Sequence, residues 1–309
     1  MTRHSSTHHE PPAAITPPPI AHVAAAVDSY SEGRDATMLA ATVSRAVGAE
    51  IMLLAVEPDL PLIIPGLQRK RVREETEAML RDTSAALAPG ARRKIDSDLS
   101  VARGIERLVR AEHRDLVVVG SNRRGDEGRV SIGHITRQLL SDLGCALAIA
   151  PRGLSAGDPL TLRRIGVGFD GGPEAHAALV TAARIAAGAG ARLVVRGAID
   201  DRVPPLGWPN VWMGAILESW EEMMDEEERD LRESITAALA GISAEAEIQI
   251  TRGRPHKSLV ALSTDVDLLV IGSRRWGPLA RLLLGGTGEA LVHAAECSLL
   301  IVPRLAGAH

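Results

Sequence analysis

Short continuous runs of apolar residues alternate along the chain with longer stretches in which apolar residues recur at helical spacing. Continuous apolar strands predict a parallel sheet that is buried on both faces, since a sheet with one wet face would alternate apolar and polar positions. We expect strands at 22–28, 51–59, 164–170 and 192–200, and helices at 35–47, 68–87, 174–189 and 215–240. In the last helix the acidic run 221–230 is expected to be the solvated face.

The pattern occurs twice. Residues 115–151 align without a gap to residues 267–303, each position being offset by 152, and both segments read apolar strand, glycine-rich loop, helix, apolar strand. Alternation of strands with helices in this order is typical of doubly wound α/β folds. The sequence therefore predicts two tandem Rossmann-like domains, each an open, mostly parallel five-stranded sheet with helices on both faces.

The length of 309 residues suits two domains, because single cores rarely grow beyond about 250–300 residues. We expect a disordered tail at 1–19, domains at 20–151 and 163–305, and a linker at 152–162, which is rich in Gly, Ser and Pro. The tail carries His4, His8 and His9, for which we weigh metal binding against a solvated segment and favour the latter.

Composition excludes several classes of protein. The net charge is −4 and no basic stripe interleaved with aromatic residues is present, which argues against a nucleic-acid partner. We expect neither a membrane-spanning segment nor a signal peptide, and hence a cytoplasmic protein. Cys145 and Cys297 are too few for a disulfide framework, and their equivalent places before the last strand of each half predict small packing residues.

Candidate ligand residues follow from topology, because open α/β sheets bind ligands beyond the carboxyl ends of their strands. This rule selects Asp28, Val56 and the loop 120–133 in the first half. In the second half it selects Asp170, Ala198 and the loop 272–286. For the two aspartates, ligand contact and capping of the following helix stand as equal alternatives.

These strand ends and loops resemble those of the universal stress protein family, twice over, from about residue 20 to residue 305. The resemblance rests on the early strand that ends in Asp, the late glycine loop after VVGS or VIGS, and the last strands, ALAIAP and SLLIVP. It implies a regulatory, non-catalytic stress-response protein with ATP or another adenine nucleotide as ligand, and Mg²⁺ only if ATP binds. It also implies that the two last strands pair within the chain, which leaves homo-oligomers open.

In ATP-binding members the loop reads G-x2-G-x9-G followed by Ser or Thr, and its amides wrap the phosphates. Each half keeps the first and third glycines but replaces the second glycine with arginine. His134 and Gly286 stand where the family has a hydroxyl residue, and Thr287 follows one place later. The candidate binding residues are Asp28, Val56, Gly120, Ser121, Arg123, Gly133 and His134 in the first half, and Asp170, Ala198, Gly272, Ser273, Arg275, Gly285, Gly286 and Thr287 in the second.

The arginines change the chemistry of the loop. A residue with a Cβ resists positive φ by about 1 kcal/mol or more, which disfavours the family's loop shape if that shape needs positive φ at this position. Arg123, Arg124, Arg274 and Arg275 could instead donate bidentate hydrogen bonds to phosphate, or be plain solvated loop residues. The second half is slightly favoured as the binding half, because its glycines leave room for close backbone approach.

Further sequence patterns suggest other motifs and other functions. Gly166, Gly168 and Gly171 spell a dinucleotide motif, but the first two lie inside the expected strand, which argues against it. Trp208 and Trp212 lie in a Pro-rich loop and suggest a lid, a partner contact or simple packing. The alternatives to a regulator are a nucleotide hydrolase or adenylating enzyme, with His134 as the best single catalytic candidate, and a structural dimer module without ligand.

Overall fold

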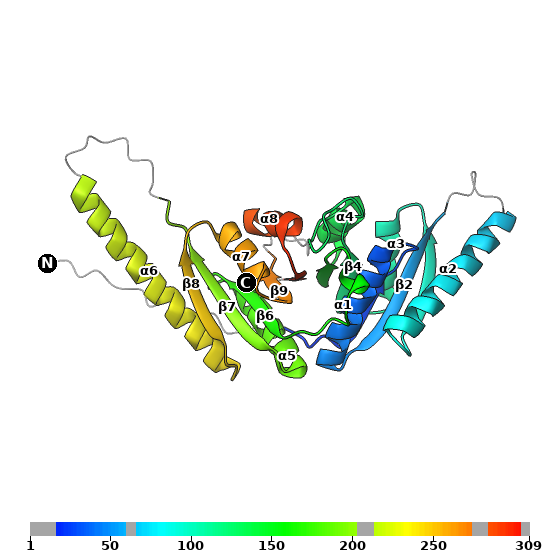
Figure 1. Ribbon diagram of the computed structural model, residues 1–309, viewed down its shortest axis with the longest axis horizontal. Helices are drawn as coiled ribbons and strands as arrows, with labels where there is room; N and C mark the ends of the chain where they lie inside the picture. Colours follow the sequence, from blue (N-terminus) through cyan, green and yellow to red (C-terminus); the bar gives the residue numbers. More distant parts are fainter. Residues whose placement is uncertain (1–16, 60–65, 203–212, 274–283, 304–309) are drawn as a thin grey trace.

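A computed structural model describes residues 17–59, 66–202, 213–273 and 284–303 of the chain (Figure 1). The first half contains β1 (His22–Ala26), α1 (Ser31–Val47), β2 (Glu50–Pro58), α2 (Gly66–Leu87), β3 (Arg92–Asp98), α3 (Val101–Ala111), β4 (Leu116–Gly120), α4 (His134–Asp142) and β5 (Ala146–Ala150). After η1 (Leu154–Ala156), the second half contains β6 (Arg164–Phe169), α5 (Pro173–Ala189), β7 (Arg192–Ile199), α6 (Met213–Gly241), β8 (Glu247–Arg252), α7 (Pro255–Ser263), β9 (Leu268–Gly272), α8 (Gly286–Ala294) and β10 (Ser298–Val302).

The strands form one sheet in the order β3-β2-β1-β4-β5-β10-β9-β6-β7-β8. Neighbouring strands are parallel within each half. The halves meet where β5 and β10 pair antiparallel, with Ile149 opposite Leu299. The α/β fold with tandem Rossmann-like domains is thus confirmed, and the two five-stranded sheets are continuous through the pairing of the last strands that the sequence led us to expect.

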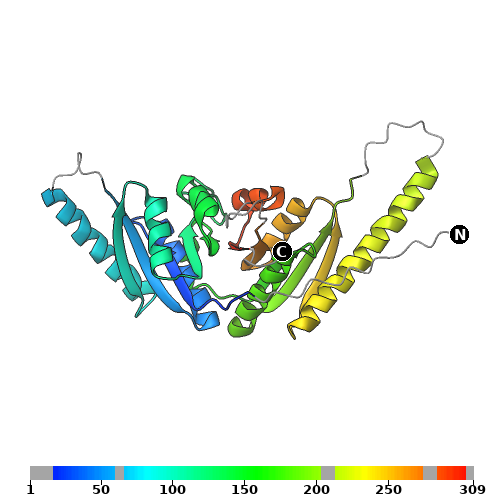
Figure 2. The same ribbon diagram turned by 180° about the vertical axis from the view of Figure 1, so that it is seen from behind.

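Helices cover both faces of this sheet. The buried residues Leu39 of α1, Leu80 of α2, Leu179 of α5 and Ile235 of α6 belong to one apolar core. A second core on the other face includes residues of α3, α4, α7 and α8. Figures 1 and 2 show the two halves side by side, with α2 and α6 at opposite ends of the molecule. Each core therefore runs across both halves.

Contacts between helices reinforce the junction between the halves. The helices α1 and α5 approach so closely that a Cβ on Gly188 would lie 1.6 Å from the backbone oxygen of Ala46. Near the start of α4, Arg137 forms an ion pair of 3.2 Å with Glu289 of α8. The side-chain pair makes a small contribution because both groups are exposed, so backbone pairing and apolar packing hold the halves together.

The segment between the halves is tied to α1. Asp35 is fully buried, and its two carboxylate oxygens accept hydrogen bonds from the backbone N–H groups of Gly153, at 2.8 Å, and Ser155, at 2.7 Å. Gly153 has φ +81°, a conformation that favours glycine. A buried carboxylate requires such partners, so the expected linker 152–162 includes a fixed turn. The expected tail lies almost wholly outside the described residues.

The elements match the sequence expectations closely where the apolar pattern is strong. In α6 the residues from Glu221 to Asp230 are mostly exposed, whereas Met224, Ile235 and Leu239 are buried, which confirms the expected solvated acidic face. Within the described part of the chain, no helix is both long and apolar enough to cross a membrane.

Candidate functional site

A cavity of about 350 Å³ opens in the second half at the carboxyl ends of β6 and β9. Residues from six elements and the segments beside them form its walls, which combine apolar side chains, two carboxylates, one arginine and the start of α8. The lining residues are Gly168, Phe169, Asp170, Glu174, Ala175, Arg196, Ala198, Pro255, Leu259, Ile271, Gly272, Leu284, Gly285, Thr287 and Gly288. Five of the predicted residues, Asp170, Ala198, Gly272, Gly285 and Thr287, are thereby brought together.

Two glycines shape the cavity by permitting close packing. A Cβ on Gly272, at the end of β9, would lie 2.5 Å from the backbone oxygen of Glu174 in the first turn of α5. A Cβ on Gly168, inside β6, would lie 2.8 Å from the Cδ1 atom of Leu259. A side chain at Gly272 would force β9 away from α5, and one at Gly168 would displace the Leu259 side chain. Packing of Gly168 in β6 against Leu259 therefore accounts for one glycine of the apparent dinucleotide motif.

Asp170 organises the turn between β6 and α5. Its Oδ1 atom accepts a hydrogen bond of 3.0 Å from the backbone N–H of Gly172, which is the N-cap residue of α5. Gly171 between them has φ +80°. The aspartate therefore closes an Asx turn ahead of the helix and is not itself the cap, a geometry that neither sequence alternative foresaw.

The start of α8 forms the anion-favouring end of the cavity. Gly285 is its N-cap residue in an extended conformation, with φ −70° and ψ 174°, and Gly286 and Thr287 open the helix. Backbone N–H groups in the first turn of a helix lack partners within the helix and favour negative charge. Gly285 and Thr287 line the cavity, so this helix end can receive an anionic group there.

Arg196 is a charged cavity residue that the sequence analysis did not select. It lies in the middle of β7, is half-buried, and occupies the place that Leu54 holds in β2. Its guanidinium donates to the Oε1 atom of Gln249 and to the backbone and hydroxyl oxygens of Ser258. A charged residue within an expected buried strand was the available signal, because such a residue requires polar partners.

The corresponding strand end in the first half has a different environment. Asp28 accepts a hydrogen bond of 3.1 Å from the backbone N–H of Tyr30, so it also forms a turn ahead of its helix. Arg123 stacks on the Tyr30 ring, with its guanidinium carbon 3.5 Å from the ring centroid. Although Asp28 keeps contact with solvent, the surrounding protein limits its hydration and raises the pKa of its carboxyl, Glu32 adds to the rise, and Arg123 opposes it.

The first-half loop is satisfied by its own hydrogen bonds. The buried Ser121 hydroxyl donates to the backbone oxygen of Ala150 at 2.8 Å and accepts from the N–H of Ser131. Further along, the N–H of Val130 donates to the backbone oxygen of Ala295 in the other half, at 2.8 Å. Arg123 is not among the described residues with positive φ. The loop therefore takes a shape that does not need a glycine at this position.

Bulkier side chains occupy the first half where the second half has its cavity. A Cβ on Gly104 of α3 would lie 2.5 Å from the Cγ1 atom of Val56, so the valine fills the space beside this helix. Leu54 is buried beneath it. In the second half the corresponding strand positions are Arg196 and Ala198. The remaining first-half candidates follow the loop: Gly133 is the N-cap residue of α4, and His134 is exposed at its first position.

Some predicted residues do not add to this geometry. Ser273 is buried, and its backbone N–H donates to the oxygen of Val302 at 2.9 Å. Gly286 lies in the first turn of α8 but does not line the cavity. Several further candidates lie outside the described residues: Arg274, Arg275, Trp208 and Trp212. Their part in the site stays a prediction.

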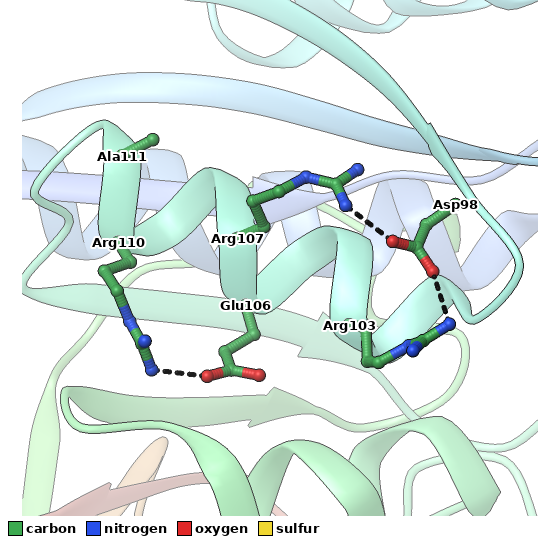
Figure 3. Close-up of a pocket in the computed structure, with 6 residues that line it drawn as sticks. All are labelled: Asp98, Arg103, Glu106, Arg107, Arg110 and Ala111. Atoms are coloured by element: carbon green, nitrogen blue, oxygen red, sulfur yellow. Dashed lines mark hydrogen bonds and ion pairs between the residues drawn. The ribbon is translucent and has the colours of Figure 1, made fainter.

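A second concave surface, along α3, consists of charged pairs (Figure 3). Asp98 accepts from Arg103 at 3.1 Å and from Arg107 at 2.6 Å, and Glu106 pairs with Arg110 at 2.5 Å. The pKa of Asp98 lies below its usual value, first because the N–H of Ser100 donates to it and then because of the two arginines. These groups satisfy one another, and the surface therefore offers less to a ligand than the cavity does.

Two parallel α/β halves, with glycines at the strand ends and a helix start at a cavity, define Rossmann-like α/β domains in tandem. The model of the universal stress protein family matches residues 19–151 and 161–303. The chain belongs to this family, as its sequence resemblance predicted, and family membership supports a stress-response role.

Comparison with individual proteins agrees with the family. The chain is 27% identical over 222 residues to the universal stress protein Rv2005c of Mycobacterium tuberculosis, which covers 69% of this chain and 71% of that protein. A crystal structure of a universal stress protein from Archaeoglobus fulgidus DSM 4304 has a TM-score of 0.63 at 18% identity, covering 92% of this chain and 98% of that one. A structure from Pseudomonas aeruginosa UCBPP-PA14 has a TM-score of 0.65 at 17% identity, covering 92% and 94%. These two likenesses show the same fold.

Proposed function

We propose that this protein is a non-catalytic stress-response regulator whose second half binds a purine nucleotide. The observation that carries the proposal is the 350 Å³ cavity, which joins strand-end residues to the start of α8. The family resemblance implies ATP or another adenine nucleotide as the ligand, with Mg²⁺ accompanying ATP. The phosphates would lie at Gly285 and Thr287, and the nucleoside near Asp170 and Ala198.

The difference in side chains at the strand ends of the two halves supports this proposal. In the first half, Val56 and Leu54 fill space, and Arg123 is stacked on Tyr30. In the second half the small residue Ala198 stands in the place of Val56 and lines the cavity. We infer that the first half serves mainly as the pairing partner of the second, which is the structural role weighed for the whole chain at the sequence level.

A nucleotide hydrolase is the second candidate, because two carboxylates, Asp170 and Glu174, line the cavity. Paired carboxylates can hold Mg²⁺ beside phosphates. His134, the catalytic candidate from sequence, lies at the start of α4 in the first half and not at this cavity. The position of His134 away from the cavity favours the regulator.

Titration calorimetry of ATP and ADP into the full chain, with and without Mg²⁺, tests the proposal. We expect a micromolar dissociation constant that Gly285→Val abolishes, because a branched side chain would enter the cavity. Gly133→Val is the matched control at the equivalent N-cap position of α4, where a Cβ would lie 3.9 Å from its nearest neighbour. If Gly133→Val abolishes binding and Gly285→Val does not, the site lies in the first half and the proposal is wrong.

Turnover separates the two candidates. Phosphate release from ATP at stoichiometric enzyme should stay at the background rate if the protein is a regulator. Release that depends on Mg²⁺ and is lost in Asp170→Asn would establish the hydrolase instead. Absence of heat with every nucleotide would contradict both candidates and leave a pairing module without this ligand.

A further inference from the structure

Arg196 breaks the correspondence between the two halves at the cavity. It is the fifth residue of β7 and pairs with Gly168, as Leu54 is the fifth residue of β2 and pairs with Ala26. Leu54 is buried in the apolar core, whereas Arg196 lines the cavity. The same register position thus holds an apolar side chain in one half and a guanidinium in the other.

Neighbouring polar residues hold this guanidinium in place. Nε and Nη2 both donate to the Oε1 atom of Gln249, the residue directly opposite on β8, and the amide nitrogen of Gln249 donates to Glu247 at 2.5 Å. Nη1 donates to the backbone and hydroxyl oxygens of Ser258, each at 3.3 Å. A guanidinium has five N–H donors. These four hydrogen bonds come from three nitrogen atoms, so at least one N–H, on Nη2, remains for a ligand as far as the described residues show.

The first half lacks this polar support. Ser258 is the fourth residue of α7, and the fourth residue of α3 is Gly104, against which Val56 packs. Lys94 stands opposite Leu54 on β3 and pairs with Glu112 at 2.9 Å. The arginine and its hydrogen-bonding partners therefore occur together in the second half, which indicates a built polar wall.

Among the described residues, no carboxylate lies close enough to Arg196 to form an ion pair with its guanidinium. Asp265 and Glu247 act on it only at longer range. Burial lowers the pKa of the guanidinium, which means that the cation is desolvated without full compensation. A half-buried cation that faces a cavity favours a ligand with acceptor atoms at that end.

The place of Arg196 in the cavity identifies which part of the ligand it meets. Successive residues of a strand point to opposite faces, so Arg196 and Ala198 lie on the same face of β7. Both line the cavity together with Leu259 of α7, whereas Gly285 and Thr287 belong to the start of α8. If the phosphates lie at α8, as the proposed function has them, the base end of the nucleotide lies at Ala198 and Arg196.

We propose that Arg196 is a specificity-determining residue that makes the cavity prefer a 6-oxopurine nucleotide to an adenine nucleotide. The inference rests on the nucleotide site proposed above. A guanidinium only donates hydrogen bonds, and the O6 and N7 atoms of guanine or hypoxanthine are both acceptors. Adenine presents the N6 amino donor in place of O6, which opposes an arginine donor. An N–H donor at this place therefore discriminates between the O6 acceptor and the N6 amino group.

Competitive binding of GTP, ITP and ATP to the full chain tests this preference. We expect GTP and ITP to bind about 10-fold or more tightly than ATP, in line with that discrimination. Arg196→Leu, which restores the residue of the first half, should reduce the preference to about one. Arg196→Lys should retain binding but lose most of the preference, because lysine lacks the planar fork. Arg192 is an exposed arginine on the same strand outside the cavity. Arg192→Leu should therefore leave the ratio of the GTP and ATP affinities unchanged.

The outcomes separate the two proposals. Tighter binding of ATP than of GTP, or a ratio that Arg196→Leu leaves unchanged, would overturn the base preference and leave the nucleotide site intact. No binding of any of the three nucleotides would overturn the proposed function and the preference together. Circular dichroism of each variant identifies a misfolded protein, and the ratio measured for Arg196→Lys decides the question if Arg196→Leu does not fold.

Discussion

The carboxylate of Asp35 in α1 accepts a hydrogen bond of 2.8 Å from the backbone N–H of Gly153, beyond the end of β5. Asp35→Ala would remove a buried acceptor and leave this N–H and that of Ser155, in a partly buried turn, without their partner. Removing a buried acceptor costs about 1–3 kcal/mol, more where it is charged. We expect urea denaturation to show a loss of this size.

A matched control for Asp35 is Asp158→Ala. Asp158 is an exposed residue of the same connecting segment, and its replacement should change the free energy of unfolding by less than about 0.5 kcal/mol. Equal effects of the two substitutions would show that the turn after β5 does not depend on the buried carboxylate.

The approach of α5 to α1 makes Gly188→Ala a strong test of how the halves pack. Because the new Cβ would lie 1.6 Å from the backbone oxygen of Ala46, the helices must separate. Overpacking costs about 1–3 kcal/mol and occasionally more, and we expect the upper end of this range in urea denaturation. Gly241→Ala, with nothing within 4 Å of the new Cβ, is the control and should leave stability nearly unchanged. A wild-type unfolding midpoint in Gly188→Ala would contradict the close contact.

The two cysteines predict that the free energy of unfolding and the reactivity of the thiols depend on pH. Burial raises the thiol pKa of Cys145 and of Cys297 from 9.0 to about 12. The folded state thus holds the protonated form, so this contribution to stability is complete below pH 9.0 and is lost as the pH rises toward about 12. At pH 8 the thiolate fraction is about 10³-fold lower than in the unfolded chain.

Mass spectrometry after iodoacetamide treatment at pH 8 checks this expectation. Both thiols should react slowly in the native protein and rapidly in urea, and any native reaction should begin at Cys145, which is less buried than Cys297. Native alkylation of Cys297 at the rate seen in urea would show a reactive thiol, against the packing role that its place before the last strand predicts.

Most of the fold could be predicted because its central strands carry strong apolar runs. The central strand β4 reads LVVVG and is almost wholly buried, and β9, the corresponding strand of the second half, has the same pattern. The edge strand β3 reads RRKIDSD and has no such run, so its place could not be assigned. Edge strands are commonly charged, which hinders pairing with other chains. The pattern of apolar residues therefore did not reveal the edge strand that faces solvent.

The candidate site could be predicted only as far as strand ends define it. Asp170 and Ala198 follow from the rule that ligands bind at the carboxyl ends of parallel strands. Arg196 does not follow from that rule, because its role depends on Gln249 opposite it on β8 and on Ser258 of α7. These partners are more than 50 residues away in the sequence, and only the strand register brings them together.

The antiparallel pairing of β5 with β10 has a consequence for how this molecule can evolve. In a dimer of identical subunits every substitution appears twice, so a change that suits one site is also imposed on the other. Here the two copies share one chain and remain at a high effective concentration relative to each other. Leu54 could remain apolar while its counterpart became Arg196, and the covalent link thus permits asymmetry that a symmetric assembly forbids.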